Sequence, residues 1–192
     1  MIPRLCVIGT SAGGVKALQT VLAGLPASFP VPIVVVHHLP PTAKIDVQAV
    51  FGRLSLLPVI EAEDKMPLED GCVYIAPPAY HLLVERTASL ALSMDELVNF
   101  SRPSIDLLFE SAADSYRDGV VGILMTGANQ DGAAGMEYIR KAGGHTIVQD
   151  PDTAEARLMP ESALRRMTPN AVLPLEKIPL HLIQLVKESA DG

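Results

Sequence analysis

The sequence lacks the features that mark a secreted, disulfide-rich or membrane-spanning protein. Its 192 residues contain only 2 cysteines, Cys6 and Cys72, and neither lies in a Cys-x-x-Cys or His/Cys pattern with the spacing of a zinc site. The apolar run at 5–8 is too short for a signal-peptide core, and no run reaches the roughly 20 apolar residues of a membrane-spanning helix. We therefore expect a cytoplasmic protein with no membrane insertion, no metal and no cofactor.

Positive charge and aromatic side chains are also scarce. Only 15 basic residues stand against 22 acidic ones, which gives a net charge of −7, and there is no Lys/Arg run. Such a chain has little positive charge with which to neutralise a phosphate backbone or an anionic membrane. Aromatic residues make up 4% of the chain and tryptophan is absent, so stacking platforms for single-stranded nucleic acid are not expected. Nucleic acid is thus excluded as an expected partner.

The chain alternates short β-branched runs with segments of helical periodicity. The runs are apolar on both faces, which is typical of parallel strands buried between helices. After Ser104, the expected N-cap, apolar residues recur at helical spacing from 105 to 116. The expected strands lie at 5–9, 32–38, 73–76, 120–125 and 145–149.

These patterns predict a single α/β domain over residues 1–192, a doubly wound, mostly parallel sheet with helices on both faces. Short strand-like pieces such as "HLLVE" (81–85) and "SLALS" (89–93) predict a small antiparallel addition at one edge. Ligands of such folds bind at the carboxyl ends of the strands. The chemically capable residues expected there are Ser11, His37, His38 and those of the loop "TGANQDG" (126–132).

The first expected strand runs into the turn "GTSAGG" (9–14), which is compatible with three kinds of site. Ser11 replaces the middle glycine of a dinucleotide fingerprint, and the lysine of a Walker loop is missing. Gly9, Ser11 and Gly13 fit the Gly-x-Ser-x-Gly nucleophile elbow, which exposes the serine Oγ and frees the Ala12 N–H to meet an oxyanion. A glycine-rich turn with Ser11 as a helix N-cap is an equally good interpretation.

A nucleophilic serine needs a base and an acid that orients the base. His37 and His38 end the second strand, and strand alternation sends them to opposite faces, so only one of them can face Ser11. Asp131 is the candidate acid, with the alternative that it is the N-cap of the helix that follows. His81, His145 and His181 stand at loop or strand beginnings without an obvious companion, and Asp150 and Asp152 are expected to be turn residues.

Six motifs occur in a specific order: "IGTSAGG", "VVHHLPP", "YIAPP", "RPSIDLLF", "ILMTGANQDGAAGM" and "LMPESAL". Together they closely resemble the catalytic domain of the bacterial chemotaxis receptor methylesterase (CheB) family, over residues 5–186. Matched residue by residue, the resemblance implies Ser11 as nucleophile, His38 as base and Asp131 as the orienting acid. It further implies hydrolysis of glutamyl methyl esters on helices of a methyl-accepting receptor or a similar signalling protein, with deamidation of receptor glutamine as a related reaction.

The chain departs from the family pattern in two places. Full-length members usually carry an amino-terminal receiver domain, for which 192 residues leave no room, so we expect activity without phosphorylation. Where the family loop resembles Thr-Gly-Met-Gly-x-Asp-Gly, this chain has Ala128 and Asn129. The backbone N–H groups of Ala12 and Ala128 are the expected oxyanion-hole donors. The alternative function is a non-catalytic module of the same fold that docks on receptors or signalling proteins.

Overall fold

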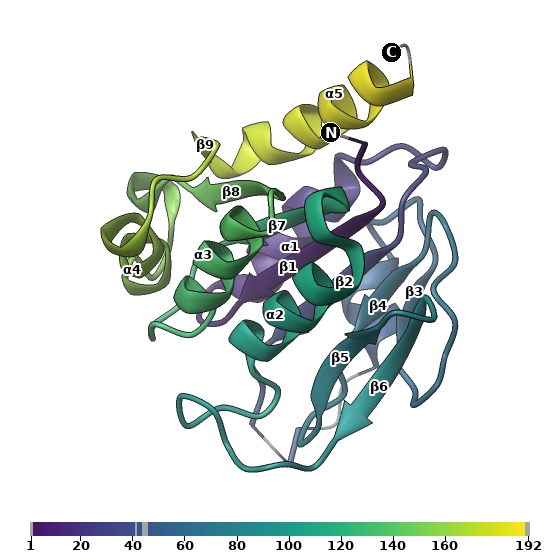
Figure 1. The fold of residues 1–192 in the computed structure, drawn as a ribbon, viewed down its shortest axis with the longest axis vertical. Helices are drawn as coiled ribbons and strands as arrows, with labels where there is room; N and C mark the ends of the chain where they lie inside the picture. The colour runs from purple at the N-terminus through teal and green to yellow at the C-terminus, as the bar shows by residue number, and fades with distance from the viewer. Residues whose placement is uncertain (1, 41, 44–45, 191–192) are drawn as a thin grey trace.

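The computed structural model describes residues 2–40, 42–43 and 46–190, and its centre is a seven-stranded sheet. Every pairing in this sheet is parallel, and the strand order is β3-β4-β2-β1-β7-β8-β9 (Figure 1). The strands are β1 (Leu5–Thr10), β2 (Ile33–His37), β3 (Val59–Glu61), β4 (Val73–Ile75), β7 (Val120–Leu124), β8 (His145–Gln149) and β9 (Ala171–Leu173). The predicted doubly wound, mostly parallel fold is confirmed.

Helices cover both faces of the sheet, and each face has its own apolar core. One core receives α2 (Ile105–Tyr116), α3 (Ala133–Lys141) and α4 (Leu158–Arg166), and the other receives α1 (Gly14–Ala23) and α5 (Ile178–Ala190). In Figure 1, α2 and α3 lie in front of β1 while α1 lies behind it. The side chains of β1 alternate between the two cores, which explains why this strand is apolar throughout.

The predicted antiparallel addition is a separate two-stranded sheet of β5 (His81–Glu85) and β6 (Ser89–Ser93). It packs beside α2 (Figure 1), where the hydroxyl of Ser111 accepts a hydrogen bond from the Val84 N–H and the hydroxyl of Ser115 donates one to the Val84 carbonyl. Strand β6 also pairs with the segment before β4, since the Leu90 N–H donates to the Met66 carbonyl. The hairpin therefore extends the face that α2 covers, close to the β4 side of the sheet.

The two cysteines and the hydropathy of the helices bear on the predictions about disulfides and membrane insertion. Both cysteines are buried as free thiols, and burial raises the pKa of Cys6 to about 12. Among the helices of the described residues, none combines the length and apolar character that crossing a membrane requires.

The order of the strands determines which loops meet. After β1 the chain builds one half of the sheet, and it returns to the other side of β1 as β7, so the direction of winding switches between β1 and β7. In doubly wound sheets ligands bind at this switch point, outside the carboxyl ends of the strands. The turn after β1 carries Ser11, β2 ends at His37, and the loop after β7 carries Asp131.

Candidate active site

The turn after β1 is held in shape by the loop after β7. The Ser11 N–H donates to the carbonyl of Thr126 over 2.9 Å, and the Thr126 hydroxyl donates to the carbonyl of Ala12 over 2.8 Å. The chain reverses at Gly13, whose φ of 76° lies in the left-handed region that favours glycine. The geometry is that of a sharp strand-to-helix turn with Ser11 at its start.

Ser11 is not the N-cap of α1, because Gly13 occupies that position and no side chain caps the helix. Within the described chain, the Ser11 hydroxyl forms no hydrogen bond. Its side chain is partly exposed and lines an open hollow of about 560 Å³, to which His37, His38, Lys16 and Glu155 also contribute. The hydroxyl is therefore accessible from solvent, next to a histidine.

His38 joins this hollow to a buried carboxylate. Its backbone N–H donates to the Thr10 carbonyl over 3.1 Å, which continues the pairing of β2 with β1. Its ring Nε2 lies 2.9 Å from Oδ2 of Asp131, and its side chain is 12% exposed. Since a carboxylate can only accept, we assign the ring proton to Nε2, which leaves Nδ1 with the free lone pair. The nitrogen available as a base is Nδ1.

His37 also lines the Ser11 hollow, but it does not share the carboxylate of His38. It is 5% exposed and packs edge-on against Phe51, with ring centroids 6.3 Å apart. Burial, and then the neighbouring His38, lower the pKa of His37 below its usual value. Its Nδ1 has no hydrogen-bond partner among the described residues. The structure thus pairs His38, and not His37, with an acid.

Asp131 is fully buried at the N-terminus of α2. Besides His38, its carboxylate accepts hydrogen bonds from the Ile105 and Asp106 N–H groups, the Ser104 hydroxyl and the Asn99 amide, over 2.7 to 3.2 Å. The alternative in which Asp131 caps α3 is wrong, because the N-cap there is Gly132 with a φ of 90°. The carboxylate instead satisfies free N–H groups of α2, where the positive end of the helix dipole favours an anion.

The electrostatics of this carboxylate favour its charged form. Burial alone raises the pKa of Asp131, but its hydrogen bonds with His38 and Ile105 outweigh burial, so the pKa lies below the usual value. The neighbouring Asp106 behaves in the opposite way, since burial and the charge of Asp131 raise its pKa. Asp131 is therefore the ionised partner of His38.

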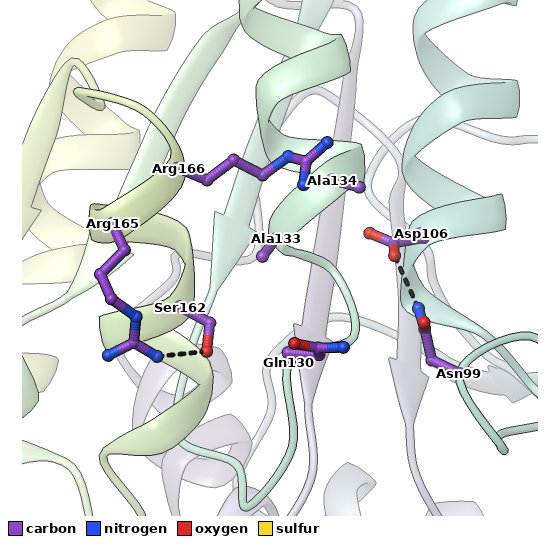
Figure 2. A pocket seen from close by; sticks show the side chains of 8 residues that line it. All are labelled: Asn99, Asp106, Gln130, Ala133, Ala134, Ser162, Arg165 and Arg166. Carbon is purple, nitrogen blue, oxygen red and sulfur yellow. Dashed lines mark hydrogen bonds between the residues drawn. The ribbon is translucent and has the colours of Figure 1, made fainter.

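A second cavity, of about 360 Å³, lies beside Asp131 and is distinct from the hollow of Ser11. Figure 2 shows Arg165 and Arg166 extending from α4 on one side, Asp106 and Asn99 on the other, and Gln130 between them. The Asn99 amide spans 2.8 Å to Asp106 and 3.2 Å to Asp131. Of the residues that line this cavity, only Asn99 and Asp106 take part in the hydrogen bonds around Asp131, and neither Ser11 nor His38 lines it.

The other histidines do have partners. Nδ1 of His81 accepts a hydrogen bond from the Ser104 N–H, and its Nε2 lies 3.0 Å from the Glu96 carbonyl, so His81 helps to fix the start of α2. His145 at the start of β8 and His181 of α5 lie with their Nε2 atoms 3.2 Å apart. These companions were not obvious because they are distant in the sequence. The expected place of His181 at the beginning of a loop or strand was wrong, since it lies within α5.

The His145 contact makes stability depend on pH. Burial, and then the neighbouring His181, lower the pKa of His145 to about 4, below the ~6.5 of an unfolded chain. Between these values the unfolded chain binds a proton that the folded protein does not, so stability falls as pH decreases from about 6.5 to about 4. We expect His145→Gln to flatten the decrease of Tm in this pH range, measured by thermal melts. A wild-type slope in the variant would contradict this assignment.

Two backbone donors face the solvent near Ser11. The N–H groups of Ala12 and Ala128 form no hydrogen bond with any described residue, and both residues are exposed. The Ala12 peptide is held in place because its carbonyl accepts the hydrogen bond from the Thr126 hydroxyl. Free donors of this kind are what an oxyanion hole requires. Their role stays a prediction.

Asn129 contacts both His38 and Asp131, a role that the sequence did not indicate when it marked this residue as a departure from the family loop. Its Nδ2 lies 3.3 Å from Nδ1 of His38, and its Oδ1 accepts from the Asp131 N–H over 3.1 Å. The second contact is an Asx turn, in which an asparagine bonds the backbone two residues on. The spacing of Asn129 and Asp131 could have suggested the turn, but not the contact with His38, which follows β2.

In the described chain, no group of three or more His, Cys, Asp or Glu side chains is arranged to bind a metal ion.

Comparison with known proteins supports a single family. The family model for CheB methylesterase matches residues 6–182. A Leptospira interrogans protein provisionally named as a protein-glutamate methylesterase/protein-glutamine glutaminase is 46% identical over 185 residues, covering 96% of this chain and 96% of that protein. A Saccharophagus degradans protein-glutamate methylesterase/protein-glutamine glutaminase is 39% identical, but the chain spans only 52% of its length. The crystal structure of the Thermotoga maritima CheB methylesterase catalytic domain matches with a TM-score of 0.89 and 35% identity, over 97% of this chain and 100% of that one.

Proposed function

This chain belongs to the CheB methylesterase family, and we propose that it hydrolyses glutamyl methyl esters of a chemotaxis receptor with Ser11, His38 and Asp131 as its catalytic triad. The observation that carries the assignment is the position of the His38 imidazole, between the buried Asp131 and the hollow of Ser11. Its Nε2 is held by an ionised carboxylate, and His38 lines the same open hollow as Ser11. A base, its orienting acid and a nucleophile are the parts that a serine esterase needs.

The first half of the reaction transfers the glutamyl group to the enzyme. Ser11 Oγ attacks the ester carbonyl carbon while Nδ1 of His38 takes the hydroxyl proton. The bond from that carbon to the methoxy oxygen then breaks, and the same proton moves from Nδ1 to the methoxy oxygen. Methanol leaves and a glutamyl-serine ester remains. Asp131 stays ionised throughout and stabilises the imidazolium.

The second half regenerates the serine. Water attacks the glutamyl-serine carbonyl as Nδ1 of His38 takes its proton, the bond to Ser11 Oγ breaks, and the proton returns to that oxygen. The free N–H groups of Ala12 and Ala128 are the proposed donors to the negative oxygen in both halves. A receptor glutamine would give the same acyl-enzyme with ammonia as leaving group, in line with the glutaminase activity that the relatives' names include.

The shape of the site agrees with a protein substrate. The Ser11 hollow is open and lies at the carboxyl ends of the central strands β1 and β2, so a side chain projecting from a receptor helix can reach the serine without entering a deep pocket. The partner proposed here is accordingly a methyl-accepting receptor, presented from its cytoplasmic helices.

Methanol release from a bacterial chemoreceptor carrying tritiated methyl esters tests this function. We expect release by the wild-type chain, no release above background by Ser11→Ala, and normal release by Ser28→Ala, which changes an exposed serine in a turn after α1. Wild-type release by Ser11→Ala would remove the nucleophile assignment. A fluorophosphonate that labels Ser11 in the wild-type chain would show the activated serine independently of the receptor chosen.

A further inference from the structure

Asn129 contacts the one atom of His38 on which the proposed mechanism depends. Its Nδ2 lies 3.3 Å from Nδ1, the nitrogen that would take the serine proton. The orientation of its amide follows from the opposite end, because Oδ1 accepts the Asp131 N–H over 3.1 Å and only an oxygen can do so. The group facing Nδ1 is therefore an NH₂ donor.

Only one hydrogen bond can be accepted at Nδ1. With its proton on Nε2, facing Asp131, a neutral imidazole has a single in-plane lone pair at Nδ1. Asn129 occupies that lone pair, while the Ser11 hydroxyl forms no hydrogen bond with any described residue. The serine and the asparagine thus compete for the same acceptor.

We propose that Asn129 blocks the base nitrogen of His38 in the free enzyme and must leave it before Ser11 can transfer its proton. The inference rests on the proposed function of the triad. Once Nδ1 carries a proton it becomes a donor and can no longer accept from the amide, so the contact is absent when the imidazolium forms. An interaction that stabilises the free enzyme but not the transition state raises the barrier.

The contact is therefore a restraint on basal activity. A carbonyl oxygen brought into the hollow by the substrate offers the released amide a new acceptor, which would make release of the base depend on substrate binding. Replacing Asn129 should then mainly change kcat/KM, the parameter that compares the free enzyme with the transition state.

The test compares three variants in the full chain. Asn129→Ala removes the whole amide. Asn129→Ser removes the amide NH₂ that reaches Nδ1, and its shorter side chain keeps an oxygen that can bond the backbone N–H two residues on, as serine turns do. Gln130→Ala is the matched control, because it removes the neighbouring amide, which lines the cavity of Figure 2 away from His38. The readouts are the rate at which a fluorophosphonate labels Ser11, kcat/KM for methanol release, and the ¹⁵N chemical shifts of the His38 ring.

We expect both Asn129 variants to label roughly 2- to 12-fold faster than wild type, the factor that one net hydrogen bond supplies. The ¹⁵N shift of Nδ1 should move toward that of an unbonded lone pair, and Gln130→Ala should match wild type. Equal or slower labelling and turnover by Asn129→Ser, with a wild-type melt, would overturn the proposal, since the amide would then assist the reaction. If Asn129→Ala has a lower Tm than wild type, the labelling rate and kcat/KM of Asn129→Ser alone test the proposal. Absence of Ser11 labelling in the wild-type chain would overturn the proposed function itself.

Discussion

His38→Ala is expected to abolish methanol release, with a loss on the order of 10⁶-fold in kcat, as happens when the base of a serine triad is removed. The reason lies in the geometry, since this ring alone connects the Ser11 hollow with the ionised Asp131. His37→Ala should retain most of the turnover, because that ring packs on Phe51 and its Nδ1 has no hydrogen-bond partner among the described residues. Initial rates on a methylated receptor measure both effects.

Thermal melts are the necessary control for this pair. His37 is the more deeply buried of the two, so its removal leaves a cavity and should lower Tm more than His38→Ala does. His37→Ala is thus expected to lose more stability, and His38→Ala is expected to lose more turnover. Full turnover by a folded His38→Ala, together with loss in His37→Ala, would move the base by one residue.

The sequence was sufficient for the parts of the site that depend on local geometry. The glycine spacing around Ser11 predicted a sharp turn, which the positive φ of Gly13 makes. That only one of His37 and His38 faces the serine stays a prediction, since both line its hollow. The parallel sheet followed from strands that are apolar on both faces, as β1 is. Each of these inferences needs only residues close together in the chain.

Features that arise from tertiary packing were beyond the same reasoning. Asp131 was weighed as a cap for the helix that follows it, but it accepts the first N–H groups of α2, which begins 26 residues earlier at Ile105 and has Ser104 as its N-cap. Strands β3 and β9 are 3 residues long, too short to carry a periodic signal. The partners of His81 and His145, and the contact of Asn129 with His38, all join segments that are distant in sequence. The sequence names the candidate groups, and the packing decides which of them meet.

Asp131→Asn is expected to reduce turnover about 10⁴-fold, the loss that follows when a triad aspartate becomes asparagine and the histidine takes the wrong tautomer. An asparagine can turn its NH₂ toward His38, and Nε2 must then accept, which puts the ring proton on Nδ1. The nitrogen facing Ser11 could then no longer take the serine proton. Methanol-release rates on the folded variant measure this loss.

The structure also predicts that this variant loses stability. All five groups bonded to the carboxylate can be donors, including two backbone N–H groups of α2, and an asparagine must direct its own NH₂ at some of them. Buried donors left without an acceptor cost about 1–3 kcal/mol. A plain helix cap would behave differently, because Asn caps helices about as well as Asp.

Asp106→Asn is the matched control for Asp131→Asn, because it also replaces a buried carboxylate by an amide. This carboxylate belongs to the same cluster and accepts from Asn99 and the Gly135 N–H, but it does not contact His38. We expect it to lower Tm while changing turnover far less than Asp131→Asn does. Near wild-type turnover by a folded Asp131→Asn would remove Asp131 from the mechanism and leave a serine-histidine pair. An equally large loss of turnover in Asp106→Asn would have a different meaning. Both carboxylates lie at the start of α2, but only Asp131 contacts His38, so the loss would then come from disturbing the start of that helix.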